Sequence, residues 1–92
     1  MGACDDCKTL VESVLNAIMD DSREFGCGVL ATEFEVECLG LASEPENPVA
    51  DIDCGVASGV LEGICQEKGI DWMKNNIPAA AELICQKIGI CS

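Results

Sequence analysis

The chain has 92 residues, of which 17 are acidic and five are basic, so its formal net charge is −12 at pH 7. A surface of this sign repels phosphate backbones and excludes nucleic acid as an expected partner, and the absence of histidine excludes a Cys/His zinc site. A hydrophobic fraction of 49% excludes a disordered acidic tail, and eight cysteines predict a small domain held by disulfide bonds in an oxidising compartment.

The first half of the chain is predicted to form two helices. Leu10, Val14 and Ile18 recur on one face of a helix over residues 5–20, which Asp5 or Asp6 is expected to cap. A second helix is predicted over residues 23–39. Its end, "TEFEVEC", alternates polar and apolar residues as a strand does, but no partner strand is predicted elsewhere, so a helix is favoured there.

The second half begins with a polar connection, "GLASEPENPVAD", which contains two prolines and is expected to be a loop. A third helix is predicted over residues 52–68, with Asp51 or Asp53 as its N-cap and Gly69 at its C-terminal cap. The stretch "IDWMKNNI" is expected to make a corner before Pro78 opens a last helix over residues 78–89. The chain is therefore predicted to be a single all-α domain over residues 1–92, with four to five amphipathic helices. No secretory signal peptide is recognised at its start, so we expect a mature domain.

The gaps between successive cysteines are 2, 19, 10, 15, 10, 19 and 5 residues, and the five inner gaps read the same in both directions. Residues eleven apart turn through about 1,100°, close to three full helical turns, so Cys27 and Cys38 share one face of the second helix. Cys54 and Cys65 share one face of the third helix for the same reason. If the two helices form an antiparallel hairpin, Cys38 meets Cys54 and Cys27 meets Cys65 simultaneously.

The remaining four cysteines lie near the two ends of the chain. Antiparallel nesting of the first and last helices predicts the bridges Cys7–Cys85 and Cys4–Cys91. The four nested bridges are expected to supply much of the stability, because closing the Cys38–Cys54 loop alone contributes about 3 kcal/mol in the chain-entropy model.

With these motifs in place, "CDDCKTLVESVL" near the start and "IPAAAELICQKIGICS" at the end resemble the saposin-like (saposin B-type) family. The family's pattern is a C-x2-C opening, a central cysteine pair and a Pro-led closing segment that ends in C-x5-C. Cys27 and Cys65 form a pair that this pattern lacks, so the chain resembles an eight-cysteine variant. The resemblance implies a folded-leaf helical bundle that opens like a clasp to cover lipid tails or a second copy.

The function implied by the resemblance is non-enzymatic binding, extraction or presentation of lipids, favoured at acidic pH, in a secreted or lysosomal protein. Expected partners are lipids or a membrane surface, a second copy of the chain and a lipid hydrolase; no cofactor or metal is expected. The alternatives are an acid-triggered, membrane-permeabilising protein of the amoebapore kind and a saposin-type interaction module of a larger precursor. An enzyme is not expected, because no histidine is available as a base and no serine has an evident activating partner.

The candidate lipid-binding residues are apolar side chains on the predicted helices and at the corner, and ordinary core packing is the alternative interpretation for each. They are Val14, Leu15, Ile18, Phe25, Leu30, Phe34, Leu61, Ile64, Trp72 and Ile77. Trp72 is expected either to anchor in lipid headgroups or to plug the end of the bundle. Gly55, Gly59 and Gly63 recur every fourth residue, which predicts tight packing against the second helix, close approach of another helix, or a bend.

Overall fold

The computed structural model of the chain describes residues 2–19, 26–42 and 52–91. Within these residues the chain forms five α-helices and no strand. They are α1 (Ala3–Met19), α2 (Cys27–Ala42), α3 (Cys54–Lys68), α4 (Ile70–Asn75) and α5 (Ile77–Lys87). The all-α prediction is confirmed, including the helical interpretation of "TEFEVEC", which lies inside α2.

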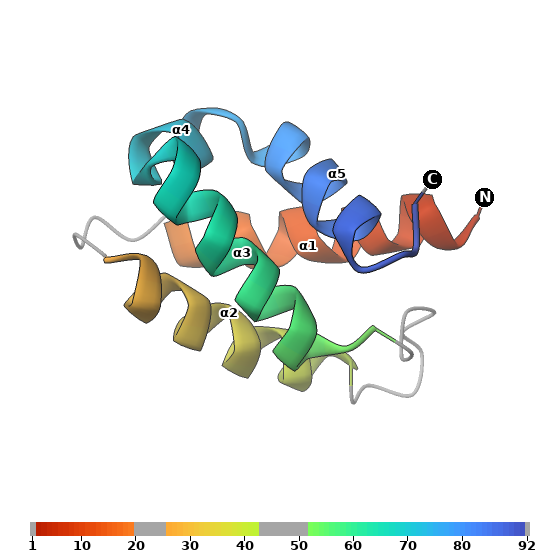
Figure 1. The fold of residues 1–92 in the computed structure, drawn as a ribbon. Helices are drawn as coiled ribbons and strands as arrows, with labels where there is room; N and C mark the ends of the chain where they lie inside the picture. Colours follow the sequence, from red (N-terminus) through yellow and green to blue (C-terminus); the bar gives the residue numbers. More distant parts are fainter. Residues whose placement is uncertain (1, 20–25, 43–51, 92) are drawn as a thin grey trace.

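Two antiparallel helix pairs make up the fold (Figure 1). The terminal pair consists of α1 and α5, and the central pair consists of α2 and α3. Within each pair the beginning of one helix is bridged to the end of the other, which fixes the antiparallel direction. α1 also packs on α2, and α5 packs on α3, so the two pairs close on each other.

The cysteine bridges are those that the spacing predicts: Cys4–Cys91, Cys7–Cys85, Cys27–Cys65 and Cys38–Cys54. Their Cα–Cα distances are 4.8, 6.1, 5.7 and 5.7 Å, inside the usual disulfide range. No cysteine is free. Four disulfide bonds fit a protein of an oxidising compartment, such as the extracellular space or the lysosome.

The N-terminal ends of the helices differ from the prediction at α1 and agree with it at α3. α1 begins at Ala3, so Asp5 and Asp6 lie in its first turn rather than capping it, where their charges still favour the positive end of the helix dipole. The side chain of Asp53 accepts a hydrogen bond of 3.1 Å from the backbone N–H of Val56 and caps α3. Asp51 lies outside the described residues.

The predicted helix limits shift by a few residues. Gly26 precedes α2, which starts at Cys27 and continues to Ala42, so three residues of the predicted loop are helical; residues 20, 23–25 and 43–51 lie outside the described part. α3 starts at Cys54 instead of residue 52. α5 starts one residue before Pro78, and Ile88 forms its C-terminal cap, so the helix ends before residue 89.

The predicted corner "IDWMKNNI" is largely helical, because most of it forms the short helix α4, the fifth of the four to five helices expected. Gly69 separates α3 from α4 with φ of 93° and ψ of 155°, a backbone conformation that is favourable only for glycine. Its N–H donates to the carbonyl of Cys65 and closes the end of α3. Asn76 then ends α4, and its Nδ2 donates to the carbonyl of Trp72 at 3.0 Å. The corner is thus a helical turn held by hydrogen bonds at both ends.

Candidate functional site

The two helix pairs meet along an aliphatic interface that forms the core of the molecule. Phe34 and Leu30 of α2 and Leu61 of α3 are fully buried, and Leu15 and Val14 of α1 meet them from the terminal pair. Ser58 is the one buried polar side chain among the described residues, and its Oγ donates to Oε1 of Glu35 at 3.3 Å. The interface therefore offers hydrophobic contact and almost no polar specificity.

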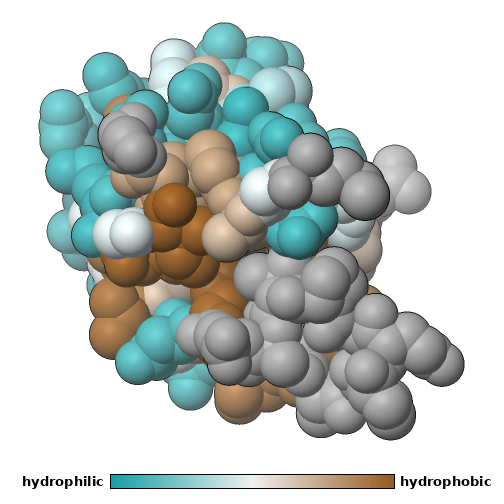
Figure 2. Space-filling model, turned by 90° about the vertical axis from the view of Figure 1, so that its right-hand side faces the viewer, coloured by the Kyte–Doolittle hydropathy of each residue, from teal (hydrophilic) through white to brown (hydrophobic). Residues whose placement is uncertain are grey.

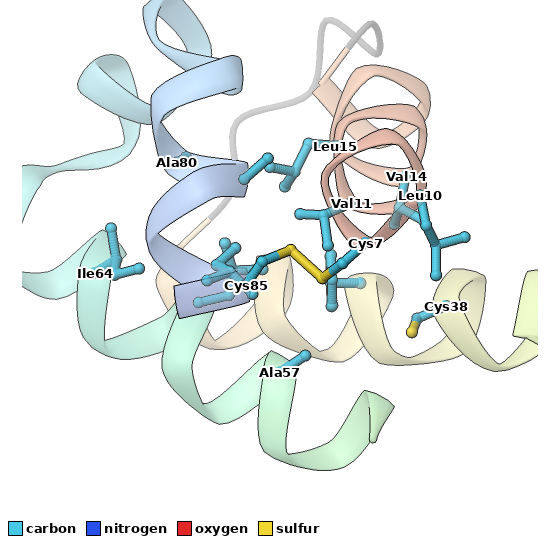
Figure 3. Close-up of a cluster of buried hydrophobic side chains, with 14 of the residues drawn as sticks. Cys7, Leu10, Val11, Val14, Leu15, Cys38, Ala57, Ile64, Ala80 and Cys85 are labelled. Carbon is cyan, nitrogen blue, oxygen red and sulfur yellow. A yellow bond between two sulfur atoms is a disulfide. The ribbon is translucent and has the colours of Figure 1, made fainter. Parts of the chain in front are cut away.

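Figure 3 shows how the pairs interlock around this interface. The Cys7–Cys85 bridge joins α1 to α5 within the terminal pair, and Val11 and Leu15 project from α1 toward α5. Leu10 and Val14 lie on the side of α1 that faces Cys38 of α2. Side chains of the terminal pair thus point in two directions, one set into their own pair and one set toward the central pair.

None of the four bridges joins the terminal pair to the central pair. Cys4–Cys91 and Cys7–Cys85 connect α1 with α5 or the segment that follows it, whereas Cys27–Cys65 and Cys38–Cys54 connect α2 with α3. The pairs are linked covalently only through the chain between α1 and α2 and through the segment from Gly69 to Asn76, which contains α4. Apart from these two connections, noncovalent contact alone holds the pairs together.

Seven of the ten predicted lipid-binding residues are buried in this interface and the surrounding core. Their exposed fractions are at most 6%: Val14, Leu15, Ile18, Leu30, Phe34, Leu61 and Ile64. Trp72 and Ile77 are half-buried beside the core, and Phe25 lies outside the described residues. Sequence reasoning missed core residues on the same interface, among them Ala57, Met73, Ala80 and Ile84. Periodicity on α3 and α5 was the available signal for Ala57, Ala80 and Ile84, whereas Met73 lies in the short helix α4.

Trp72 lies at the end of the molecule where α3 turns into α4. The Nζ atom of Lys68 lies 5.6 Å from the centre of its ring, a cation–π contact. The indole packs partly against the core, so Trp72 covers the bundle end while leaving part of its ring exposed. Both expected roles of this residue remain compatible with its position.

The three glycines of α3 do not pack against α2, which corrects the internal-packing interpretation. All three are exposed, and a Cβ atom built at Gly59 or Gly63 meets nothing within 4 Å. At Gly55 a Cβ would meet only the carboxylate of Asp53, at 3.5 Å. These glycines therefore line the outer side of α3 and are not required for a close helix–helix contact inside the molecule.

Two open grooves on the surface are lined by described residues, and neither is predominantly apolar. The larger, about 580 Å³, runs between α1 and α5. Its lining side chains include Asp5, Lys8, Thr9, Glu12 and Glu82. A second, about 200 Å³, lies between α1 and the α4–α5 junction and is lined by Asn16, Met19, Lys74 and Ile77. Neither of these two grooves is an enclosed apolar cavity, and the apolar side chains of the described residues are gathered in the core between the helix pairs.

Among the described residues, no three His, Cys, Asp or Glu side chains are grouped so that they could hold a metal ion. None of the five described helices is both long enough and apolar enough to cross a membrane. Comparisons of the chain with protein-family models, with curated proteins and with solved structures find no match. The fold and the bridges therefore define its class directly: an all-α protein of two disulfide-stapled helix pairs.

Proposed function

We propose that the protein is a non-enzymatic lipid-binding protein of the saposin-like kind, which takes up lipid tails between its two helix pairs. The observation that carries this proposal is the position of the bridges. Each pair is stapled twice, yet no bridge crosses the aliphatic interface between the pairs. Separation of the pairs therefore breaks no covalent bond, and each pair keeps its own structure.

The apolar interface supplies the chemistry for such a ligand. Water cannot solvate the separated faces favourably, because burying apolar surface is worth about 25 cal/mol per Å². Acyl chains can replace the lost contacts, since they present the same aliphatic surface that Leu30, Phe34 and Leu61 contact in the closed molecule. Gly69 has no side chain, and its φ of 93° lies outside the helical range, so it is a suitable hinge between α3 and α4.

The net charge of −12 suggests that pH regulates contact with membranes. Anionic headgroups repel the ionised protein at neutral pH. Carboxyl groups in model peptides titrate near pH 4, so acidification removes negative charge and lowers this repulsion. Binding to anionic vesicles is therefore expected to rise as pH falls, which fits a secreted or lysosomal protein that presents lipid to a hydrolase. A homodimer would be a second way to cover the separated faces.

The proposal is tested with a single tryptophan placed in the interface. Phe34→Trp in a Trp72→Phe background reports from the buried side of α2, and Val36→Trp in the same background reports from the exposed side. Vesicles whose acyl chains carry bromine quench a nearby tryptophan. We expect quenching of the tryptophan at position 34 at about pH 4.5 and little at about pH 7.5. Native mass spectrometry of the purified protein should also find co-purified lipid.

Quenching at position 36 without quenching at position 34 would show adsorption of a closed molecule and would contradict lipid uptake between the pairs. Dye release measured on the same vesicles separates lipid transfer from the permeabilising alternative, because transfer leaves the vesicles intact. A precursor that embeds these residues in a larger chain would favour the interaction-module alternative.

A further inference from the structure

The outer side of α2 carries a continuous apolar ridge that the core does not use. Val29, Val36 and Leu39 are exposed by 53%, 64% and 55%. Thr32 lies between them on the same face, and its Oγ1 donates to the carbonyl of Gly28 at 3.0 Å, so its hydroxyl is bonded within the helix. The outer ridge is defined as Val29, Thr32, Val36 and Leu39, a spacing of three, four and three residues that aligns them along about 15 Å of helix.

The outer ridge lies opposite the core face of the same helix. Leu30, Phe34 and Cys38 are fully buried, and Val36 is turned by about 160–200° from Phe34 and Cys38 at 100° per residue. Single exposed valines are ordinary on protein surfaces. Four large hydrophobic side chains are exposed in the described part of the chain, and three of them line up on one face of α2. The ridge is therefore a contiguous apolar surface and differs from isolated exposed residues.

Carboxylates flank the outer ridge on both sides. Glu35 and Glu37 are the neighbours of Val36 in sequence, so they project about 100° to either side of it. The hydrogen bond from Ser58 holds Glu35 on the side of α3 without neutralising its charge. α2 contains no lysine or arginine. The face therefore presents an apolar line between two negative edges.

We propose that the outer ridge of α2 is a docking surface for a cationic amphipathic helix of a partner protein. Such a helix presents an apolar stripe to Val29, Val36 and Leu39, and lysine or arginine side chains beside the stripe reach the carboxylates of Glu35 and Glu37. Helices recognise apolar surfaces through residues spaced by three or four positions, and charge complementarity sets the orientation and speed of association. The interaction needs neither lipid nor separation of the helix pairs, so it is independent of the proposed function.

The negative charges favour a cationic helix over the two other partners that could cover an apolar face, a second copy of the chain and a lipid bilayer. A second copy would bring a further charge of −12 and the same glutamates against this face, which opposes self-association at neutral pH. A bilayer that accepted the ridge would also have to accept the carboxylates beside it, which opposes insertion at neutral pH. Figure 2 shows the end of the molecule at which α2 finishes and α3 starts. At this end a hydrophobic area lies beside hydrophilic surface.

The experiment measures binding of a fluorescent leucine–lysine peptide of about 18 residues to the full chain at neutral pH. The variant Val29→Ser/Val36→Ser removes two of the three large apolar side chains of the ridge without changing charge, and we expect it to bind the peptide at least about tenfold more weakly. The matched control is Ala17→Ser/Ala79→Ser, which alters exposed positions on α1 and α5. Glu35→Gln/Glu37→Gln should also weaken binding and reduce its dependence on salt.

An equal affinity of the ridge variant, the control and the wild type would overturn the proposal, because attraction to the net charge alone would then explain binding. The same holds if sedimentation shows a dimer of the wild type that the ridge variant abolishes, since the occupant would then be a second copy. Loss of binding to phosphatidylcholine vesicles in the ridge variant, with peptide binding unchanged, would identify a membrane surface instead. Circular dichroism of each variant verifies that the helices are intact.

Discussion

Two glycines, Gly69 and Gly63, differ in whether their position in the structure requires glycine. Gly69 has a positive φ of 93° and connects α3 to α4, so its lack of a side chain is a structural requirement. Gly63, six residues earlier, lies in the middle of a regular helix with open space where a Cβ would be. The sequence predicted the cap position of Gly69 but left three interpretations open for Gly63, and the backbone shows that of the two only Gly69 requires glycine.

Alanine substitutions at these two positions should therefore change stability in opposite directions. We expect Gly63→Ala to raise the free energy of unfolding by about 0.5–1 kcal/mol, because alanine restricts the unfolded chain and favours the helix. Gly69→Ala should lower it by about 1–3 kcal/mol, since alanine is strained at this backbone conformation. Guanidinium unfolding with the bridges intact measures both. A gain at position 69 would show that the junction relaxes freely.

Burial and exposure on one helix provide a second comparison at the residue scale. Phe34 is fully buried between the pairs, whereas Val36, two residues later, is exposed by 64%. We expect Phe34→Ala to lower the free energy of unfolding by about 3–5 kcal/mol, and Val36→Ala to change it by less than about 0.5 kcal/mol. Thermal and guanidinium unfolding measure the difference. Similar losses in the two variants would contradict the described orientation of α2.

At the scale of elements, the central pair depends on two bridges that lie at opposite ends of its helices. Cys38–Cys54 closes the end next to residues 43–51, and Cys27–Cys65 closes the end where α3 turns into α4. The second bridge is the one that the saposin-like pattern lacks. It fixes the central pair at the end nearest Gly69, so this pair is bridged at both ends.

Removing the Cys27–Cys65 bridge should loosen the central pair without unfolding it. With Cys38–Cys54 in place, the shortest covalent path between Cys27 and Cys65 runs through that bridge, so the closed loop has only about two dozen residues. Closing a loop of this size stabilises the folded state by about 3 kcal/mol in the chain-entropy model. We expect Cys27→Ser/Cys65→Ser to lose about that much stability and to speed amide hydrogen exchange in the last turns of α3. Exchange in α1 and α5 is the internal control. Uniform acceleration across all helices would show instead that the molecule opens as one unit.

For the whole molecule, closure of the two pairs decides what is exposed. The Cα radius of gyration is 11.9 Å, close to the value of about 12 Å for a compact chain of this length. In this closed form most of the predicted lipid-binding residues form the core, and the high negative charge is spread over a small surface. Self-repulsion between these charges opposes closure.

Salt should therefore stabilise the protein at neutral pH. We expect the midpoint of thermal unfolding to rise as sodium chloride increases from about 0.01 to about 0.5 M at pH 7, because the Debye length shortens from about 30 Å to less than 10 Å. The sequence isoelectric point of about 4.1 supplies the control, since a salt series at that pH should have little effect. An unchanged midpoint at pH 7 would mean that the repulsion contributes little to stability.

The sequence by itself determined the four longer helices and the pairing of cysteines in the central hairpin, because both follow from local periodicity, whereas the terminal bridges required antiparallel nesting of the first and last helices as well. A helical period of 3.6 places Cys27 above Cys38 and Cys54 above Cys65 whatever the rest of the chain does, and equal spacing then selects the pairing. The tertiary structure alone decided how the pairs close, that α4 replaces a corner, and that the glycines of α3 and the outer ridge of α2 face outward. A helix such as α2 carries apolar residues on two sides, and only packing against α1 and α3 selects the side that becomes the core.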